Sequence, residues 1–128
     1  MARTASAPAP SACDGPTARG RRAESLAATW LAARGFLITA RNVRVDRDEL
    51  DLVAWDGATL VIVEVRSARP GAMVDPRETL RGGKRQRLHD ATLRYAQSIQ
   101  ARDVRVDFVA VRGDEVEHFE NALELSVF

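Results

Sequence analysis

Two short apolar segments on either side of Asp56-Gly57 give the clearest pattern in the chain. An Asp-Gly pair between two segments rich in β-branched residues is a strong signal for a β-hairpin. The second segment, residues 60–65, is apolar up to Glu64, which is typical of a strand that is covered on both faces. We therefore predict a β-hairpin over residues 48–66, at the centre of a sheet.

The predicted hairpin carries Asp51, Glu64 and Arg66 on one face. Side chains alternate along a strand, and a two-residue or a four-residue loop keeps the same parity. A loop of Asp56-Gly57 places Asp51 opposite Ile62 and diagonal to Glu64, whereas a loop over 56–59 places Asp51 directly opposite Glu64. Either register brings the two carboxylates within roughly 5 to 8 Å of each other.

Two carboxylates at this separation repel each other unless a positive charge lies between them. Ionised carboxylates beside apolar strand residues are also costly unless they are paired or bound to a metal. A divalent cation is one solution. The other is ordinary pairing, in which Asp51 pairs with Arg66, or Glu64 and Arg66 mark a solvated strand end. The hairpin pattern alone favours neither.

The rest of the chain predicts helices and strands around this hairpin. Helical periodicity predicts helices over 21–33 and 83–100, and alternation predicts strands over 36–45, 104–111 and 116–119. Residues 67–79 contain prolines and glycine without a clear period and are predicted to form a long loop, a kind of segment that is often functional. Residues 1–19, rich in Ala, Pro and Ser, are predicted to be a disordered tail, and residues 20–128 a single domain.

Two helix positions aim charged side chains toward the hairpin. Glu24 precedes the apolar stripe of its helix by three, four and seven residues, so it lies at the inward edge of the first turn. It either joins the hairpin acids or favours the helix N-terminus because of the helix dipole. Lys84 precedes the apolar stripe of the second long helix and either points toward the sheet or snorkels at the end of that stripe.

Composition limits the kind of site that the chain can build. With Cys13 as the single cysteine and only two histidines, a thiolate cluster or a histidine-rich zinc site is excluded. Any metal must be held mainly by oxygen, which favours Mg²⁺ or Mn²⁺. No apolar run approaches the roughly 20 residues of a membrane span, and no hydrophobic leader is present, so we expect a cytoplasmic protein with no membrane partner.

The basic residues are unevenly distributed. A net charge of +1 does not by itself indicate a nucleic-acid partner. Arginines nevertheless cluster before the first predicted helix and around the start of the second, where they either contact phosphates or form a solvated helix face. The candidates for nucleic-acid contact are Arg22, Arg66, Arg81, Lys84 and Arg85.

Three further features carry weaker signals. Asp107 interrupts an apolar strand and is either a helper acid or a polar group at the edge of the core with backbone partners. His89 and His118 lie on polar segments and receive no chemical role. The stretch Gly82-Gly83-Lys84-Arg85 lacks the upstream glycine spacing and the Ser or Thr of a phosphate loop, so we exclude nucleoside triphosphate binding.

Taken together, the residues and the order of elements resemble the UPF0102 (YraN) family. This family is similar to archaeal Holliday-junction resolvases within the restriction-endonuclease-like, or PD-(D/E)xK, superfamily. The resemblance covers nearly all of residues 20–123. The matched stretches are residues 41–44, 49–54, 63–66 and 106–109, together with Glu24, Lys84, Ala91 and Tyr95.

The resemblance implies an α/β fold, a restriction-endonuclease-like mixed β-sheet with a central hairpin flanked by helices. It also implies a Mg²⁺ (or Mn²⁺) site and a nucleic-acid substrate, in particular DNA. By position, Asp51 and Glu64 match the metal-binding acids of the family, and Glu24 matches its helix-borne glutamate. Arg66 occupies the position of the catalytic lysine. Because the similar resolvases act as symmetric dimers, a homodimer is a further expectation.

The arginine at position 66 leaves three functions open. Arginine stays protonated and cannot accept a proton from water, but it can bind a phosphate in a bidentate manner. The first hypothesis is a Mg²⁺-dependent, structure-selective DNA endonuclease in which Lys84 supplies an amine. The second is a non-catalytic nucleic-acid-binding module with a degenerate nuclease site, and the third is a protein-interaction domain that keeps the fold. The candidate catalytic residues are Glu24, Asp51, Glu64, Arg66 and Lys84.

Overall fold

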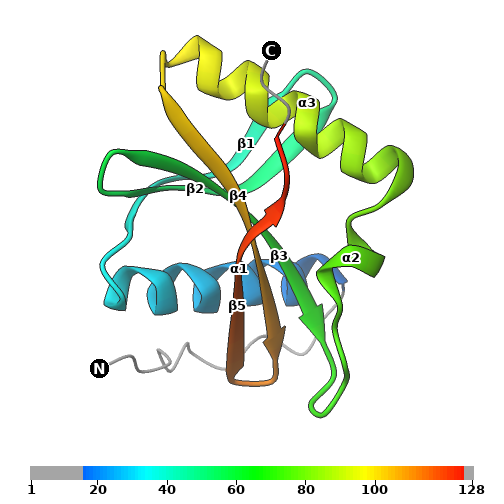
Figure 1. Ribbon diagram of the computed structural model, residues 1–128. Helices are drawn as coiled ribbons and strands as arrows, with labels where there is room; N and C mark the ends of the chain where they lie inside the picture. Colours follow the sequence, from blue (N-terminus) through cyan, green and yellow to red (C-terminus); the bar gives the residue numbers. More distant parts are fainter. Residues whose placement is uncertain (1–15, 126–128) are drawn as a thin grey trace.

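A computed structural model of the chain describes residues 16–125, which form one β-sheet with a long helix on each face (Figure 1). The predicted tail, residues 1–19, lies outside the described residues up to position 15. The first helix begins at Pro16 rather than at 21, so residues 16–19 are helical. Proline suits the first turn of a helix because its missing N–H has no partner to lose there.

The observed elements follow the predicted order. The predicted helices and strands are confirmed, with boundaries that move by a few residues. A short helix forms inside the predicted loop, and the last strand extends to 123 because it continues through polar residues that hid it in the sequence. The elements are α1 (Pro16–Ala33), β1 (Leu37–Val45), β2 (Asp48–Asp56), β3 (Thr59–Ala68), α2 (Pro76–Thr79), α3 (Gly82–Ser98), β4 (Asp103–Arg112) and β5 (Glu115–Leu123).

The sheet is mixed, with the strands in the order β1-β2-β3-β4-β5. Neighbouring strands are antiparallel except for β3 and β4, which are parallel and are connected through α2 and α3. The β2–β3 hairpin is therefore interior, as predicted. The expected α/β class is confirmed, and the arrangement is compatible with a restriction-endonuclease-like fold. No helix between residues 16 and 125 has the length and apolar character needed to cross a bilayer.

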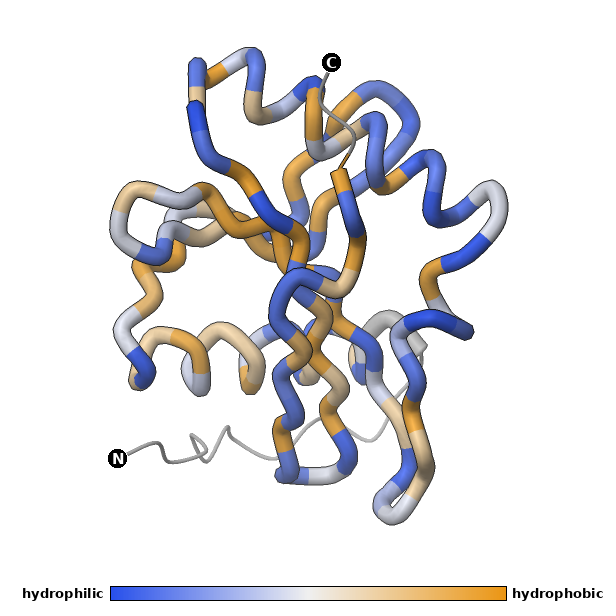
Figure 2. Tube along the Cα trace, in the orientation of Figure 1, coloured by the Kyte–Doolittle hydropathy of each residue, from blue (hydrophilic) through white to orange (hydrophobic). Residues whose placement is uncertain are grey.

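Strand β3 is apolar on both faces because each face packs against a helix. Val61 and Val63 pack with Leu31 on the α1 side, whereas Leu60 and Ile62 pack on the α3 side. Figure 2 shows the hydrophobic strand segments, in orange, meeting in the middle of the molecule. The continuous apolar run in the sequence thus reflects burial between two layers.

The turn of the hairpin fixes its register. Asp56 pairs with Thr59 and Leu52 with Val63, which is the register predicted for the loop 56–59, although only Gly57 and Ala58 lie between the paired strands. Gly57 adopts a φ of 62°, a left-handed conformation that favours glycine. Continuing the pairing by one step beyond Leu52 and Val63 places Asp51 directly opposite Glu64.

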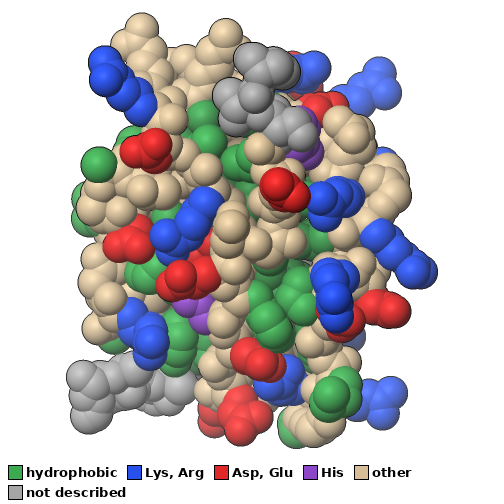
Figure 3. All heavy atoms as spheres, viewed as in Figure 1, with side chains coloured by type: hydrophobic (Ala, Val, Ile, Leu, Met, Phe, Trp, Pro, Cys, Tyr) green, Lys and Arg blue, Asp and Glu red, His purple; other side chains and the backbone are tan. Residues whose placement is uncertain are grey.

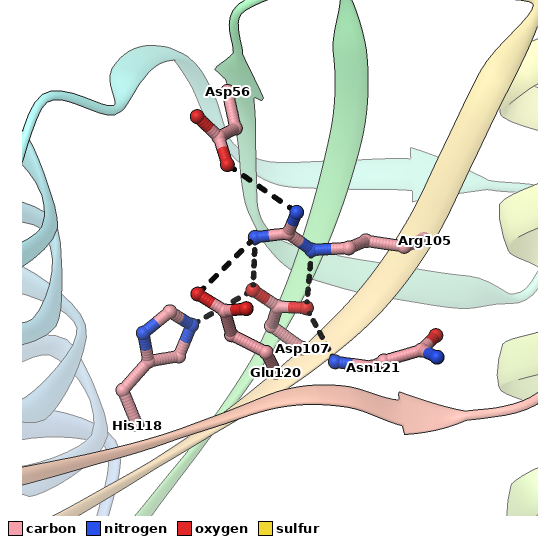
Figure 4. Close-up of polar contacts among 6 residues, drawn as sticks. All are labelled: Asp56, Arg105, Asp107, His118, Glu120 and Asn121. Carbon is pink, nitrogen blue, oxygen red and sulfur yellow. Dashed lines mark hydrogen bonds and ion pairs between the residues drawn. The ribbon is translucent and has the colours of Figure 1, made fainter.

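A buried polar network lies on the α1 side of the sheet (Figure 4). The Asp107 side chain is fully buried and accepts two hydrogen bonds from the Arg105 guanidinium, at 2.9 and 3.1 Å. It also accepts the backbone N–H of Asn121 at 2.9 Å and lies 2.7 Å from His118 Nε2. The His118 ring contacts Trp30 and Phe36 edge-on, with centroids 5.8 and 5.6 Å away. The network therefore joins β4 and β5 to the end of α1.

The network affects the pKa of Asp107. Burial alone would raise this pKa, but the hydrogen bonds from His118, Arg105 and the Asn121 backbone outweigh burial and lower it. The native state therefore favours the ionised carboxylate. The resulting stability is present above the pKa of an unfolded Asp, about 4, and is lost as the pH falls through the lower native value.

We predict that Asp107→Asn lowers the free energy of unfolding by about 3 kcal/mol at neutral pH, because it leaves the Arg105 charge without a buried partner. Urea unfolding measured between pH 7 and pH 3 checks this. The difference between the variant and the wild type shrinks below about pH 4, because Asp107 of the wild type then takes up a proton on unfolding. Equal stability of the two proteins at pH 7 would contradict the prediction.

Candidate active site

Asp51 and Glu64 come together at the end of the β2–β3 pair, as the sequence predicted. The Asp51 Oδ2 atom accepts a hydrogen bond of 2.9 Å from the backbone N–H of Val65, the residue after Glu64. The side chain of Glu64 is only 12% exposed. The hairpin register therefore produces two neighbouring carboxyl groups, both partly withdrawn from water.

The surroundings of Asp51 change its pKa. Burial, followed by the negative charge of Glu64, raises the pKa of Asp51 to about 7. The hydrogen bond from Val65 acts in the opposite direction, and the charge of Glu24 adds to the increase. Asp51 forms no ion pair with a Lys or Arg of the described chain. The site therefore lacks positive charge on the Asp51 side.

Two cations approach Glu64 instead. Lys84 Nζ of α3 lies 3.4 Å from Glu64 Oε2, and Arg66 Nη2 lies 3.8 Å from the same oxygen. The prediction that Lys84 points from its helix toward the sheet is thus confirmed. Pairing of Asp51 with Arg66, the alternative left open by the sequence, is wrong, because Arg66 pairs with Glu64.

Glu24 approaches the acids from α1, on the other layer. Its carboxylate accepts a hydrogen bond of 3.0 Å from Asn42 Nδ2 of β1, and its charge contributes to the raised pKa of Asp51. Asn42, which sequence reasoning did not single out, adopts a φ of 51°, and asparagine tolerates this left-handed conformation. Within residues 16–125 no group of three or more His, Cys, Asp and Glu side chains is placed to hold a metal ion. The structure thus assembles two of the three predicted acids as close neighbours.

The acids line a small pocket beneath α3, which we call the acid pocket. Its volume is about 260 Å³. Opposite the acids, Arg87 Nε lies 3.7 Å from Asp48 Oδ1, so a second ion pair borders the same space. The residues that line the acid pocket are Asp48, Glu49, Leu50, Asp51, Glu64, Lys84, Arg87, Leu88 and Ala91.

A second hollow of about 690 Å³ lies at the end of β3, against the start of α1 and on the opposite face of the sheet from the acid pocket. Arg66 and Val65 line it, together with Arg22, one of the predicted phosphate contacts, which lies 3.9 Å from Asp114. Arg69 also lines it and was missed in the sequence, because it follows the strand in a segment without periodicity. Arginine side chains therefore gather at the end of β3.

The other predicted phosphate contacts lie where α3 begins. Arg81 precedes the helix in an extended conformation without a side-chain cap, and Arg81 and Arg85 are exposed. The first turn of α3 contains no acidic residue that would compensate the helix dipole. Figure 3 shows several Lys and Arg side chains on the side of the molecule where α2 lies and α3 begins.

Asp107 does not assist the hairpin acids. In the parallel β3–β4 register it pairs with Val63, whose side chain faces α1, whereas the acid pocket lies beneath α3. Asp107 is instead a buried polar group that accepts a hydrogen bond from the backbone. Sequence reasoning missed His118 as its partner, although a charge inside an apolar strand is a signal that a polar partner exists.

Comparisons with known proteins place the chain among relatives. The model of the uncharacterised protein family UPF0102 matches residues 23–111. A UPF0102 protein of Anaeromyxobacter dehalogenans is 46% identical over 117 residues, covering 87% of each chain. A UPF0102 protein of Sorangium cellulosum, sce2912, is 41% identical over 117 residues, covering 91% of this chain and 75% of its own. Among solved structures, Pyrococcus furiosus SfsA in complex with Ca²⁺ is 14% identical with a TM-score of 0.38, over 85% of this chain and 64% of that one.

The raised pKa of Asp51 gives a testable dependence of stability on pH. Because the native state holds the proton more tightly than an unfolded Asp does, the resulting stability is present below about pH 4 and is lost as the pH rises through about 7. We predict that Asp51→Asn, which cannot ionise, exceeds the wild type by about 2 kcal/mol at pH 8 and approaches it at pH 4. Urea unfolding in the presence of a chelator measures this, and parallel pH curves for the two proteins would contradict it.

Proposed function

This chain belongs to the UPF0102 family, and we propose that it is a nuclease-like protein that binds DNA and hydrolyses phosphodiester bonds with the help of a divalent cation. One observation carries the proposal. Two carboxyl groups, Asp51 and Glu64, meet at a strand end where Lys84 also points, beside a hollow bordered by arginines. Paired acids with a neighbouring amine suit the charge changes of phosphodiester hydrolysis.

The donor set fits Mg²⁺ or Mn²⁺. Mg²⁺ is usually bound by one or two carboxylates and several waters, so two acids are sufficient. Burial and the charge of Glu64 raise the pKa of Asp51, and a bound cation would offset both effects. Asp51 and Glu64 would hold the ion, and Glu24 would complete the shell through water. When bound, the cation supplies Lewis acidity at the phosphoryl oxygen.

Lys84 takes over the role of the motif lysine that position 66 no longer fills. An arginine at position 66 cannot accept a proton, whereas the Lys84 amine can exchange one and is 39% exposed to the pocket. Glu64 orients this amine through their ion pair. Arg66 then binds a phosphate oxygen and neutralises charge that develops during the reaction. The two side chains thus divide between them the tasks that a single lysine performs in the similar nucleases.

The arginines around the site provide the contact with DNA. Arg22 and Arg66 border the larger hollow, while Arg81 and Arg85 lie exposed beside Lys84 at the start of α3. Exposed guanidinium groups bind phosphates without reading sequence, which suits an enzyme that selects the structure of its substrate. The small net charge of the chain does not oppose this, because the arginines are unevenly distributed over the chain.

We predict metal-dependent cleavage of branched or flapped DNA by the wild type. Asp51→Asn and Glu64→Gln each lower the cleavage rate by about 100-fold or more, because each removes a charge that the reaction needs. Asp103→Asn and Glu115→Gln, which change exposed acids away from the pocket, are matched controls and cleave normally. The measurement is cleavage of labelled DNA with Mg²⁺ or Mn²⁺, after circular dichroism has shown that all variants fold.

Two results would contradict the catalytic proposal. Cleavage that persists in Asp51→Asn and Glu64→Gln would show that other residues, or a contaminant, cut the DNA. Salt-sensitive DNA binding without cleavage under any condition would support the binding module with a degenerate site, the alternative that Arg66 suggested.

A fourth prediction separates the role of Lys84 from that of its neighbours. Lys84→Met is expected to lower kcat by about 100-fold with little change in KM, because it removes a group that acts on the reacting atoms. Arg85→Gln removes a charge one residue away and is expected to raise KM instead. Lys84→Arg keeps the charge but not the exchangeable proton, so a low kcat in this variant shows that the proton matters. Unchanged kinetics in Lys84→Met would contradict the prediction. Lys84 would then only snorkel at the end of the apolar stripe and take no part in the reaction.

A further inference from the structure

We infer that the larger hollow at the end of β3, here called the arginine groove, binds the phosphate backbone of a single nucleic-acid strand that flanks the cleaved bond. The inference rests on the proposed function and extends it to a part of the molecule that the resemblance to the family left without a role. The arginine groove lies between the start of α1, the end of β3 with the residues that follow it, and the β4–β5 turn. It is lined by Arg19, Gly20, Arg22, Ala23, Leu26, residues 65–70, Val111 and Gly113.

The charge of the arginine groove has one sign. Four of its lining residues are arginines and none is acidic. In residues 16–125, Arg19 and Arg69 take part in no ion pair, and Arg22 reaches only Asp114, at 3.9 Å between exposed side chains. Such a surface ion pair is weak, so little positive charge in the groove is neutralised by the protein. The groove is complementary to an anion.

Arg66 is the arginine of the groove that also lies near the acids. Its Nη2 atom lies 3.8 Å from Glu64 Oε2, and its side chain is 41% exposed. The exposed part of the guanidinium can donate a charge-assisted hydrogen bond to a phosphate oxygen. Arg66 therefore adds to the positive charge that the groove offers an anion.

The size and lining of the groove favour one flexible strand. A volume of about 690 Å³ lies in the range of clefts that hold a single small molecule, so a few nucleotides fit but a duplex does not. The floor consists of small and aliphatic side chains such as Ala23, Leu26 and Val65, and no aromatic ring is present for a base to stack on. Contacts are therefore made to the backbone and are independent of sequence.

The arginine groove and the acid pocket lie on opposite faces of the sheet near the same end of β3. Glu64 lines the acid pocket beneath α3, whereas the next residue, Val65, packs with the α1 layer and lines the arginine groove. A nucleic acid that reaches both sites must therefore bend around this end of β3. A single strand bends easily and a duplex resists bending, which favours DNA with a single-stranded flank near the cleavage point.

The test compares the double variant Arg19→Gln/Arg69→Gln with a control of equal charge, Arg21→Gln/Arg102→Gln. Arg21 lies on the same helix as Arg19 but does not line the groove, and Arg102 is exposed before β4. Binding is measured by fluorescence anisotropy, in a chelating buffer without metal, to a blunt DNA duplex and to the same duplex with a short single-stranded flap. A second series replaces the flap with RNA of the same sequence.

We expect the wild type to prefer the flapped duplex. Arg19→Gln/Arg69→Gln loses about tenfold in affinity for the flapped DNA and no longer prefers it, and the slope of log K against log salt decreases by about 1.4, or 0.7 for each phosphate contact. The control double variant keeps the preference. Equal losses with DNA and RNA flaps support contact with phosphates rather than sugars. Unchanged melting temperatures show that both double variants fold, and Arg69→Gln alone gives a milder change in the same direction.

Two outcomes would overturn the inference and leave the proposed function intact. In the first, Arg19→Gln/Arg69→Gln binds the flapped duplex as the wild type does. In the second, the control loses the preference to the same extent, which would make the effect one of net charge. Failure of the wild type to bind any of the nucleic acids at low salt overturns the proposed function itself, so the two failures are distinguishable.

Discussion

The register of the β2–β3 hairpin is the constraint on which the rest of the site depends. The tight turn at Gly57 pairs Leu52 with Val63, and one step further it sets Asp51 against Glu64. A slip by one residue would turn one of these carboxyl groups to the opposite face of the sheet. Because β3 is apolar on both faces, its hydrophobic pattern alone does not oppose this slip. The turn therefore determines where the acids lie.

Each face of the sheet carries a buried or partly buried carboxyl group, and the two groups have different surroundings. On the α1 side, Asp107 is fully buried but receives hydrogen bonds from Arg105, His118 and the backbone, so its pKa is lowered. On the α3 side, burial and the charge of Glu64 raise the pKa of Asp51 to about 7, because its single backbone hydrogen bond does not outweigh them. The first arrangement stabilises the fold. The second stores an unfavourable interaction that a cation would relieve, as functional sites commonly do.

The sequence predicted the hairpin, the convergence of Asp51 and Glu64, and the orientation of Lys84, because each follows from a strand or helix period. It did not predict the partners of these side chains. Whether Arg66 pairs with Asp51 or with Glu64 depends on rotamers near a strand end, and periodicity does not describe them. The arginine groove was equally hidden, because Arg19 and Arg69 are fifty residues apart in sequence and meet only through the packing of α1 on the end of β3. Polar residues in β5 concealed both the length of that strand and the burial of His118.

The central claim is that Asp51 and Glu64 jointly hold a divalent cation. The most direct test is a crystal of the protein soaked in Mn²⁺, with the anomalous signal mapped at the wavelength of the manganese edge. The account predicts a peak between the two carboxylates and its absence from an identically soaked crystal of Asp51→Asn. A map without a peak there, with the two side chains turned away from each other, would contradict it.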